Sequence, residues 1–589
     1  MSVDAWFTLA VVVVMFVGLA LDLVPPAATV LGAMITLLVF GVIDEEQAFA
    51  GFSNPAPLTV AALYVLARAA DKTAMLAPLV TRMLGSRSDG GPGTLARLTF
   101  PVAGISAFIN NTPLVQMMIP EITSWAAKRR LYPSRFLIPL SYAAILGGTI
   151  TVIGTSTNLV VSGLLQQSGE PPFSLFEISV VGGGSALAGM ITLILVAPRV
   201  LPDRRGAEES LVGNRAREFY VEMVVEEGGR VVGKTVEEAG LRSLEGVHLV
   251  EIERHGKAIT PVNPNRTLQA GDRLKFAGRA DLIVDLQRTP GLRSAEDKHM
   301  WAIDDPQHIF FEAVIGAASP LVGKTLAETD FRQRYGAAVI AIHRAGEPVR
   351  EKLGSVRLRA GDTLLLLSSR DFRTRWRDSH DFLVIARLGG APPSATRKAP
   401  LVAVTSLAVI TLAAFEVMPI LHLALLAAAL MIVARVVSVS EARNAIDLDV
   451  ILLIAAAFGV GAAIESTGLA QSLADAFVDL FGSFGTVGIV LGVVLSTTIM
   501  TEVITNNAAA AVIFPIAISV ATASGLDPRM MAIAVAVTAS SSFLTPLGYQ
   551  TNTMVYGPGG YRFVDFLRAG IPVNIAVVTT IVALTTLQA

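Results

Sequence analysis

The chain contains no cysteine, which excludes disulfide bonds, zinc–thiolate sites and cysteine nucleophiles. Its seven histidines show no HExxH-like spacing, so a catalytic zinc site is not expected. Charge is also scarce, because Asp, Glu, Lys and Arg make up 16% of the 589 residues, against roughly 25% in soluble proteins. The net charge of -2 gives no reason to expect nucleic acid as a partner. Since no nucleophile motif, metal cluster or carboxylate dyad is present, an enzyme is the least expected class.

Apolar sequence, in contrast, is abundant: 52% of the residues are hydrophobic and the mean hydropathy is +0.59. Apolar runs long enough to cross a bilayer, which takes roughly 20 residues, follow one another from Trp6 to Val200 and from Leu401 to Leu587. The first run has no basic residue ahead of it and no small-residue cleavage site after it, so we expect a span and not a signal peptide. From Asp203 to Lys398 the chain is charged and alternating. The sequence therefore predicts a polytopic α-helical membrane protein with an α+β insert.

Each membrane part is predicted to contain five spans and one re-entrant hairpin. In the first part, Asn110-Asn111-Thr112-Pro113 interrupts the stretch 94–125. Proline lacks an N–H, and asparagine side chains compete with the backbone for hydrogen bonds, so a continuous helix is disfavoured there. Such backbone is tolerated at membrane depth only when it is buried in protein or lines a cavity. The predicted spans are 6–24, 26–42, 54–70, 135–165 and 175–200, then 400–417, 419–436, 448–466, 529–556 and 570–588, with the second hairpin at 485–521.

Loop charges predict the orientation of these spans. The loops around 43–53 and 166–174 contain no Lys or Arg, whereas the loops on the other side are basic. By the positive-inside rule both termini are then outside and the insert is cytoplasmic, in the inner (plasma) membrane. Because five spans is an odd number, the second part is predicted to be inverted relative to the first; Arg529 is the one basic residue on the wrong side. The residues that define the inside are Arg82, Arg87, Lys128, Arg129, Arg130, Arg135, Arg199, Arg204, Arg205, Arg435, Arg443, Arg562 and Arg568.

The two membrane parts also correspond in sequence. Asn110-Asn111 corresponds to Asn506-Asn507, and the stretch 154–158 (GTSTN) corresponds to 548–552 (GYQTN). Paired interruptions of this kind are the best sequence pointer to the central site of a transporter. Broken helices leave carbonyl groups that suit a small cation, and N–H groups that suit an anion. Neither motif contains Asp or Glu, and Glu121 and Glu502 are expected nearer the membrane faces, so a neutral site for an anion carried with cations is predicted.

These motifs resemble those of the divalent anion/sodium symporter family of the ion-transporter superfamily. That family has Ser-Asn-Thr at each hairpin tip, where this chain has Asn110-Asn111-Thr112 and Asn506-Asn507-Ala508. The resemblance implies a homodimer that carries a small anion with Na⁺ by alternating access. With fewer tip hydroxyls than the family's dicarboxylate carriers, the chain is expected to take a compact oxyanion such as sulfate. It further implies substrate contacts from Asn111, Thr112, Thr155, Ser156, Asn507, Ala508 and Thr551, and sodium contacts from Asn110, Asn111, Gly154, Asn158, Thr505, Asn506, Asn507, Gly548 and Asn552.

The insert contains an internal repeat. Gly233-Lys234-Thr235 recurs as Gly323-Lys324-Thr325, and Gly271-Asp272 recurs as Gly361-Asp362, both 90 residues later. Each copy is predicted to fold as a strand, a turn, a short helix and further strands. The pattern resembles the TrkA C-terminal ligand-sensing domain, which implies a small regulatory ligand, often a nucleotide. The predicted domains are 1–202, 203–300, 301–395 and 396–589.

Residues 228–235 formally match a Walker A spacing, but the second copy has Ala318 in place of the first glycine, so a turn is expected there and ATP hydrolysis is not. Other functions remain open at this point. Within transport, the alternatives are dicarboxylate, citrate or arsenite as substrate, and protons in place of sodium. A ligand-gated channel is disfavoured, because the chain has no filter-like repeat and no ring of like charges. A membrane receptor would bind its ligand tightly without moving it.

Overall fold

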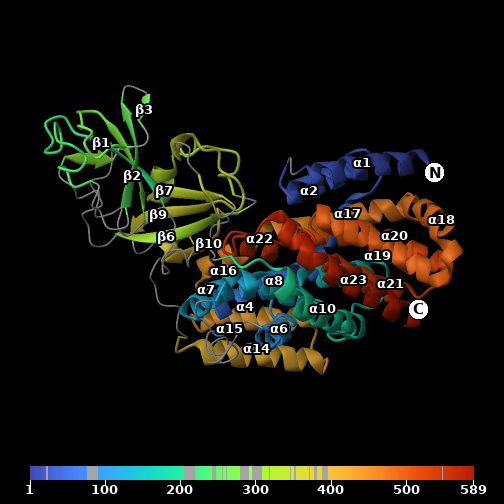
Figure 1. Ribbon diagram of the computed structural model, residues 1–589. Coiled ribbons are helices and arrows are strands. Elements are labelled where there is room, and N and C mark those ends of the chain that lie inside the picture. Colours follow the sequence, from blue (N-terminus) through green and yellow to red (C-terminus); the bar gives the residue numbers. More distant parts are fainter. Residues whose placement is uncertain are drawn as a thin grey trace.

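The structure is a computed structural model of the 589-residue chain. It combines a large helical body with two β-sheets set at one end of it (Figure 1). It describes residues 1–589 except 22–23, 74, 76–90, 130, 205–218, 242–246, 255–256, 260–261, 279–290, 295–307, 317–318, 345–346, 350–352, 370–371, 377–380, 388–395, 547 and 589. Among the residues used above, Arg82, Arg87, Arg130, Arg205 and Ala318 lie outside the described residues.

The first membrane part is helical, with interruptions at the two places that the sequence predicts. A helical hairpin turns at residues 107–110, and the following span is interrupted at residues 149–155, where Asn and Gly-Thr motifs replace regular helix. Its helices are α1 (Val3–Ala20), α2 (Pro26–Val39), α3 (Glu45–Ser53), α4 (Pro55–Thr73), α6 (Pro92–Ser106), α7 (Asn111–Lys128), the 3-10 turn η1 (Pro133–Arg135), α8 (Leu137–Gly148), α9 (Ser156–Gln167) and α10 (Ser179–Val200).

The second membrane part repeats this order of elements. Its hairpin turns at Ile504–Thr505, and its interrupted span is broken at residues 540–549. The short helices α3 and α16, which the sequence did not predict, each begin with a capping box. The helices are α14 (Ala399–Ala414), α15 (Ile420–Val433), α16 (Val439–Ala445), α17 (Leu448–Ser466), α18 (Leu469–Phe481), the 3-10 turn η4 (Gly482–Phe484), α19 (Gly485–Val503), α20 (Asn506–Ser524), α21 (Pro528–Ala539), α22 (Gln550–Tyr556) and α23 (Phe563–Gln588).

The two parts pack against each other in a reciprocal way. Helix α4 of the first part contacts α15 of the second, and α2 of the first part contacts α17 of the second. Each part therefore packs against a helix of the other in two places. The last helices of the parts, α10 and α23, run antiparallel, because Gly184 faces Leu584 while Gly189 faces Val577. Small residues at such crossings let helices approach closely. Within the described residues, seven helices are long and apolar enough to cross a membrane, and α2, α14, α15 and α21 are shorter apolar helices.

The insert contains two five-stranded sheets with the same strand order, β3-β2-β4-β1-β5 and β8-β7-β9-β6-β10. Within each sheet every pair of neighbouring strands is antiparallel. The strands are β1 (Phe219–Val225), β2 (Val247–Arg254), β3 (Lys257–Ile259), β4 (Arg273–Gly278) and β5 (Leu292–Ser294), then β6 (His308–Ile315), β7 (Ala337–Arg344), β8 (Glu347–Pro348), β9 (Thr363–Ser369) and β10 (Phe382–Arg387). The short helices α12 (Phe331–Tyr335) and α13 (Phe372–Trp376) and the 3-10 turn η3 (Leu353–Ser355) belong to the second sheet's segment.

Corresponding positions of the two sheets make the same contacts. Arg254 pairs with the buried Asp272, and Arg344 pairs with Asp362. The Walker-like segment forms a turn in which Gly233 has a positive φ of 80° and Thr235 exchanges hydrogen bonds with Glu238. The short helix expected after this turn is replaced by further turns in the first copy. These contacts make the segment a structural turn.

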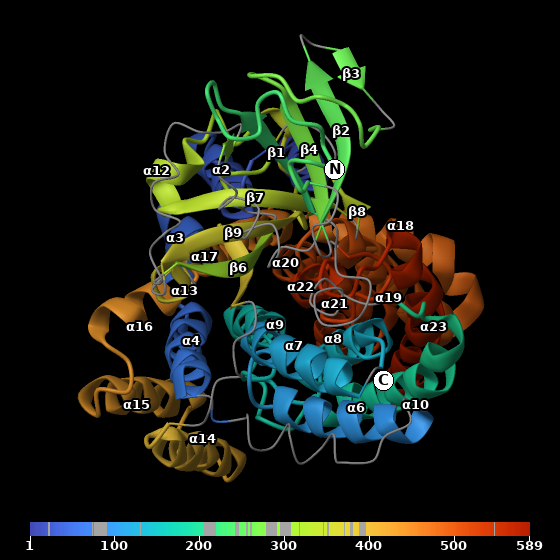
Figure 2. The same ribbon diagram turned by 60° about the vertical axis from the view of Figure 1, so that its left-hand side comes forward.

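The second sheet rests on the helical body next to α22. A Cβ built on Gly557 would lie 3.4 Å from both Gly361 O and Thr363 Oγ1. Val314 of β6 belongs to the same buried apolar cluster as the membrane helices. Figure 2 shows the sheet of β6, β7 and β9 above the helices, with the sheet of β1, β2 and β4 farther from them. The insert therefore touches the chain immediately after the second interrupted span.

Candidate functional site

The tip of the first hairpin is held by Ser106 and Asn111, at the end of α6 and the start of α7. Ser106 Oγ lies 2.6 Å from Asn111 Oδ1 and 2.8 Å from Ala144 O. Asn111 Nδ2 donates to the Tyr549 hydroxyl at 2.6 Å. Because Asn111 is only 1% exposed, its amide is committed to these partners. The first tip thereby reaches the interrupted span of the second part.

The tip of the second hairpin has the same internal bonds. Thr501 Oγ1 lies 2.9 Å from Asn506 Oδ1 and 2.6 Å from Ala539 O. Ser106, Asn111 and Ala144 are each 395 residues before their counterparts Thr501, Asn506 and Ala539. The structural counterpart of Asn111 is therefore Asn506, one residue away from the correspondence read from the sequence, and Thr112 then corresponds to Asn507. The sequence placed Asn507 there because two adjacent asparagines leave the register open by one residue.

Each hairpin tip hydrogen-bonds the interrupted span of the other part. Asn507 Oδ1 accepts from Ser156 Oγ at 3.2 Å and from Thr157 Oγ1 at 3.0 Å. In the other direction, Thr112 Oγ1 donates to Gln550 Oε1 at 3.0 Å. The Tyr549 hydroxyl, which holds Asn111, also lies 3.3 Å from Thr155 Oγ1. The four motifs that the sequence singles out thus meet in one place.

Two asparagines hold the broken segments in shape. Asn158 Nδ2 donates to Gly148 O at 3.1 Å and to Thr151 O at 2.9 Å. Asn552 Nδ2 donates to Ser542 O and Thr545 O, both at 3.2 Å. Both asparagines are fully buried. Their amides donate to carbonyl groups that the breaks leave without a helical partner. Each asparagine therefore stabilises the ends of the half-helices around it.

The other predicted residues lie around this centre in different environments. Thr551 is buried and accepts a hydrogen bond from Ser141 at 2.8 Å, so it faces α8. Ala508 is buried within α20 and offers only a methyl group. Thr505 is the residue that precedes α20, and its carbonyl accepts from Ala509 N. Gly154 packs against Gly148 O, where a Cβ would come within 2.5 Å.

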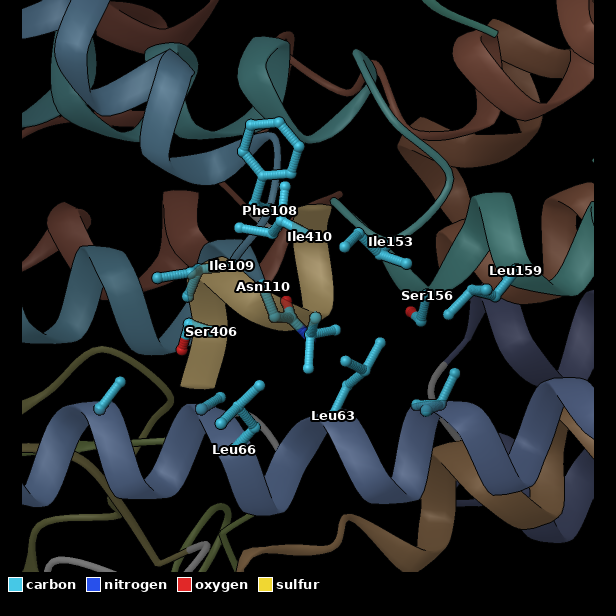
Figure 3. Close-up of a pocket in the computed structure, with 14 residues that line it drawn as sticks. Leu63, Leu66, Phe108, Ile109, Asn110, Ile153, Ser156, Leu159, Ser406 and Ile410 are labelled. Carbon is cyan, nitrogen blue, oxygen red and sulfur yellow. The ribbon is translucent and has the colours of Figure 1, made fainter. Parts of the chain in front are cut away.

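A cavity lies beside the first hairpin tip, and Asn110 and Ser156 face it (Figure 3). Its remaining walls come from α4 and α14, so it separates the hairpin from helices of both parts. The cavity is mainly apolar, with Asn110, Ser156 and Ser406 as its polar residues. It gives the first tip free space beside α4 and α14.

The helix N-termini at this centre indicate the sign of the charge that it can bind. Helices α7, α9 and α20 begin at Asn111, Ser156 and Asn506, the residues that form the crossed bonds or lie beside them. The first turn of a helix presents unpaired N–H groups and a positive partial charge. Together with the hydroxyls of Thr112, Thr155 and Thr157, these groups favour an anion.

Glu502 lies elsewhere than the sequence predicted. Its carboxylate accepts from Phe543 N at 2.7 Å, Leu544 N at 2.8 Å and Thr545 N at 3.0 Å, inside the second break. The sequence places Glu502 near the end of the predicted hairpin helix but does not show where its side chain points. For that reason the prediction put it nearer a membrane face. The second break therefore contains a carboxylate, whereas Ala107 stands at the corresponding position of the first hairpin.

Sequence reasoning missed Tyr549, Ser106 and Thr501 as well as Glu502. Ser106 and Thr501 had a detectable signal, since a hydroxyl residue precedes the tip asparagine by five positions in both hairpins. Tyr549 stood inside the GYQTN motif, but nothing in the sequence shows which way its ring points.

Arg529, the basic residue on the unexpected side, is paired within the structure. It forms a two-pronged ion pair with Glu177, in the loop before α10, and donates to Pro171 O at 2.9 Å. Its guanidinium also lies 5.4 Å from the centre of the Phe173 ring. These contacts within the protein account for an arginine on the side whose loops otherwise contain few basic residues.

Known proteins match this chain over most of its length. The sequence profile of the citrate transporter family (CitMHS) matches residues 11–538. A protein of Chlamydomonas reinhardtii named for a regulatory role in sulfur deprivation is 36% identical, over 91% of this chain and 94% of its own. The uncharacterized transporter sll0640 of Synechocystis is 33% identical over 96% and 94%. Sodium/sulfate cotransporter 1 of Chlamydomonas reinhardtii is 27% identical over 95% and 87%.

Proposed function

Since the chain belongs to the citrate transporter family of the ion-transporter superfamily, we propose that it is a secondary active transporter that carries sulfate together with Na⁺. Membership of a transporter family fits the many apolar helices. The choice of sulfate and sodium draws support from the relative named as a sodium/sulfate cotransporter. It also draws support from the chemistry of the site.

The crossed hydrogen bonds between the tips and the interrupted spans carry this proposal. Asn111 reaches Tyr549 and Asn507 reaches Ser156 and Thr157, so one centre contains groups from both membrane parts. A site shared between two parts opens and closes when the parts move against each other, which is what alternating access requires.

The residues of this centre divide into two roles. Amide and hydroxyl groups of Asn111, Thr112, Thr155, Ser156 and Asn507 bind the anion beside the N-termini of α7, α9 and α20. Carbonyl oxygens of the hairpin turns and breaks, near Asn110, Gly154, Thr505, Asn506 and Gly548, form the sodium sites. Asn158 and Asn552 belong to these sites and hold the two broken segments in shape. Ala508 and Thr551 line the substrate site from behind these groups.

The wider architecture of the proposal follows the sequence. The membrane parts are inverted repeats of five spans and one hairpin, in the inner (plasma) membrane, with both termini outside. The insert is cytoplasmic, consists of two TrkA C-terminal-like domains and regulates transport by binding a small ligand such as a nucleotide. Two chains form a homodimer. The antiparallel pair α10 and α23 supports the inverted repeat, and the identical order of strands in the two sheets supports two repeated domains in the insert.

Citrate is the second candidate, because the family profile is that of citrate transporters. Citrate carries three carboxylates, and a compact oxyanion fits better with a centre in which Ala508 offers no hydroxyl. A single assay separates the two substrates.

Uptake into proteoliposomes tests the proposed function. Purified protein in vesicles should accumulate labelled sulfate when an inward Na⁺ gradient is imposed, and excess unlabelled citrate should compete weakly. An inward proton gradient without Na⁺ should drive no uptake. Citrate uptake with no sulfate uptake would replace the substrate, and sulfate uptake that ignores the Na⁺ gradient would refute the coupling.

A further inference from the structure

The leading end of the insert is fixed to the helices around α22 and α23. Arg204 Nη1 donates to Gly560 O at 2.9 Å and to Asp565 Oδ2 at 2.7 Å, and the Asp565 carboxylate is buried. The second sheet contacts Gly557, which lies in the same loop as Gly560, between α22 and α23. The leading end and the second sheet are therefore attached to the same helices.

The trailing end of the insert is fixed to a different set of helices. Thr396 N donates at 3.0 Å to the carbonyl of Thr73, the last residue of α4. Lys398, which immediately precedes α14, donates from Nζ to Ala434 O at 3.0 Å and to Arg435 O at 2.9 Å, just after the end of α15. The trailing end is therefore attached to α4, α14 and α15.

These two sets of helices have separate apolar cores. The buried apolar side chains of α14, α15 and residues 62–70 of α4 form one cluster, whereas those of α8, α10, α22 and α23 belong to another. The cavity beside Asn110 lies between α4 and α14 on one side and the first hairpin tip on the other. Figure 2 shows α4, α14 and α15 to one side of α8, α10 and α23. Each set can move as a body, because its own packing is kept when it moves.

We propose that the insert is a restraint that bridges these two bodies and slows their movement during transport. This rests on the proposed function, because alternating access requires relative movement within the membrane. Since the two ends of the insert are attached to different bodies, such movement has to strain the insert or break the contact of the second sheet with Gly557. The bridge therefore stabilises the conformation of this structure and slows departure from it. Loosening either attachment speeds transport.

Gly557→Leu tests the contact between the second sheet and the loop after α22. A Cβ at this position lies 3.4 Å from Gly361 O and from Thr363 Oγ1, so the outer atoms of a leucine push the sheet away, while the φ of −68° at Gly557 suits any residue. The maximal rate of sulfate uptake in proteoliposomes should rise about threefold. Structural damage would lower the rate instead. Gly354→Leu is the matched control in the segment of the same sheet, because a Cβ on Gly354 meets nothing within 4 Å.

Lys398→Gln tests the trailing attachment independently. It removes both hydrogen bonds to the end of α15, so a rise of about threefold in the maximal rate is again expected. Lys234→Gln, at an exposed lysine in the first copy of the insert, is its control and should leave the rate unchanged. Thermal unfolding shows which variants are folded, and if Gly557→Leu is not, Lys398→Gln alone decides. Rates that equal or fall below the wild-type rate in the folded variants would overturn the restraint while sulfate transport stands. Absence of sulfate uptake by the wild type would overturn both proposals.

Discussion

Tyr549 is the residue at which the two membrane parts meet most directly. Its hydroxyl accepts from Asn111 Nδ2 and lies within hydrogen-bond distance of Thr155 Oγ1, and both partners are assigned to the anion. In the proposed function, the tyrosine hydroxyl therefore occupies the Asn111 amide donor that the anion needs. Release of Asn111 and Thr155 from Tyr549 is then part of substrate binding.

Tyr549→Phe should consequently bind sulfate more tightly than the wild type. Without the hydroxyl, the buried amide of Asn111 has lost an acceptor, which costs the free protein about 1–3 kcal/mol. An anion that supplies the missing acceptor recovers part of this cost. The thermal unfolding temperature should be lower in the absence of sulfate, and the increase caused by sulfate should be larger. A smaller increase than in the wild type would show that Tyr549 helps to hold the anion.

Polar residue types at the breaks were predictable from the sequence, but their partners were not. Asn, Gly and Thr stand out in long apolar runs, so Asn111, Thr155 and Asn552 were found as members of broken segments. Tyr549 and Glu502 were missed because their roles depend on contacts between segments that are far apart in the chain. Which of two adjacent asparagines corresponds to Asn111 is also decided by tertiary contacts. The sequence paired Asn111 with Asn507, whereas the structure shows that Asn506 is its counterpart.

At the level of helices, close approach between α8 and the first hairpin shapes the site. A Cβ on Gly148 would lie 2.7 Å from Asn111 Oδ1 and 2.9 Å from Asn111 Nδ2. Neither atom can give way without breaking the bonds to Ser106 or Tyr549. The end of α8 therefore fixes the orientation of the Asn111 amide.

Gly148→Ala should abolish sulfate uptake, because the added methyl group displaces Asn111, and overpacking should cost about 1–3 kcal/mol of stability. Gly104→Ala is the matched control on α6, where a Cβ meets nothing within 4 Å. The control should transport normally and gain up to about 1 kcal/mol from the higher helix propensity of alanine. Uptake and thermal unfolding measured on both proteins check this. Normal uptake by Gly148→Ala would mean that the position of Asn111 is not critical.

Most helices were predictable because hydropathy reports them directly. The ten predicted spans and two hairpins coincide with helices or with pairs of half-helices, to within a few residues at most ends. Helix α3, α16 and α18 escaped prediction because they are short or two-sided and lack an apolar run long enough to span a bilayer. The sidedness of the spans and the identity of the insert as TrkA C-terminal-like domains stay predictions.

The loop before α10 is tied to α21 by the Glu177–Arg529 pair, and this tie should depend on pH. Burial alone would raise the pKa of Glu177, but hydrogen bonds from Arg529 and from Ser174 N bring the pKa below its ordinary value. A carboxyl group with a lowered pKa adds stability above its ordinary pKa of about 4.3 and loses it as the pH falls through the folded-state pKa.

Glu177→Gln should therefore be less stable than the wild type at pH 7, by up to about 1 kcal/mol since the pair is partly exposed. The difference should shrink as the pH is lowered, because the wild-type carboxylate becomes protonated. Thermal unfolding of both proteins between pH 7 and about pH 2, well below the ordinary carboxyl pKa of about 4.3, measures this, with the exposed Glu465→Gln as control. A difference that does not change with pH would show that the ion pair contributes nothing.

In the whole molecule, the insert contacts the membrane part beside the second interrupted span. Gly361, in the turn before β9, and Thr363, the first residue of β9, contact Gly557, one residue beyond the end of α22. Helix α22 begins at Gln550 of the site. If the insert regulates transport as proposed, a shift of this segment would act on the half-helix that carries Asn552. Along the chain, only residues 553–556 of α22 separate Asn552 from Gly557.

A reversible cross-link tests this contact, and the absence of native cysteine makes it clean. Gly557→Cys is combined with Thr363→Cys, because a Cβ on Gly557 would lie 3.4 Å from Thr363 Oγ1, the atom that a cysteine sulfur would replace. The two thiols would then be within reach of each other. Oxidation should slow sulfate uptake by fixing α22 to the insert, and a reductant should restore it. Each single variant should be insensitive to both reagents. If the cross-linked protein transports as fast as the reduced one, α22 does not move relative to the insert.

In the proposed function, the two membrane parts build one shared anion site and not one site each. Equilibrium binding of labelled sulfate to the purified protein in saturating Na⁺ tests it through stoichiometry. The shared site predicts one sulfate per chain, and complete loss of binding in Asn111→Ala and equally in Asn507→Ala, with both variants folded. Two sulfates per chain, or retention of half the binding in either variant, would contradict the account.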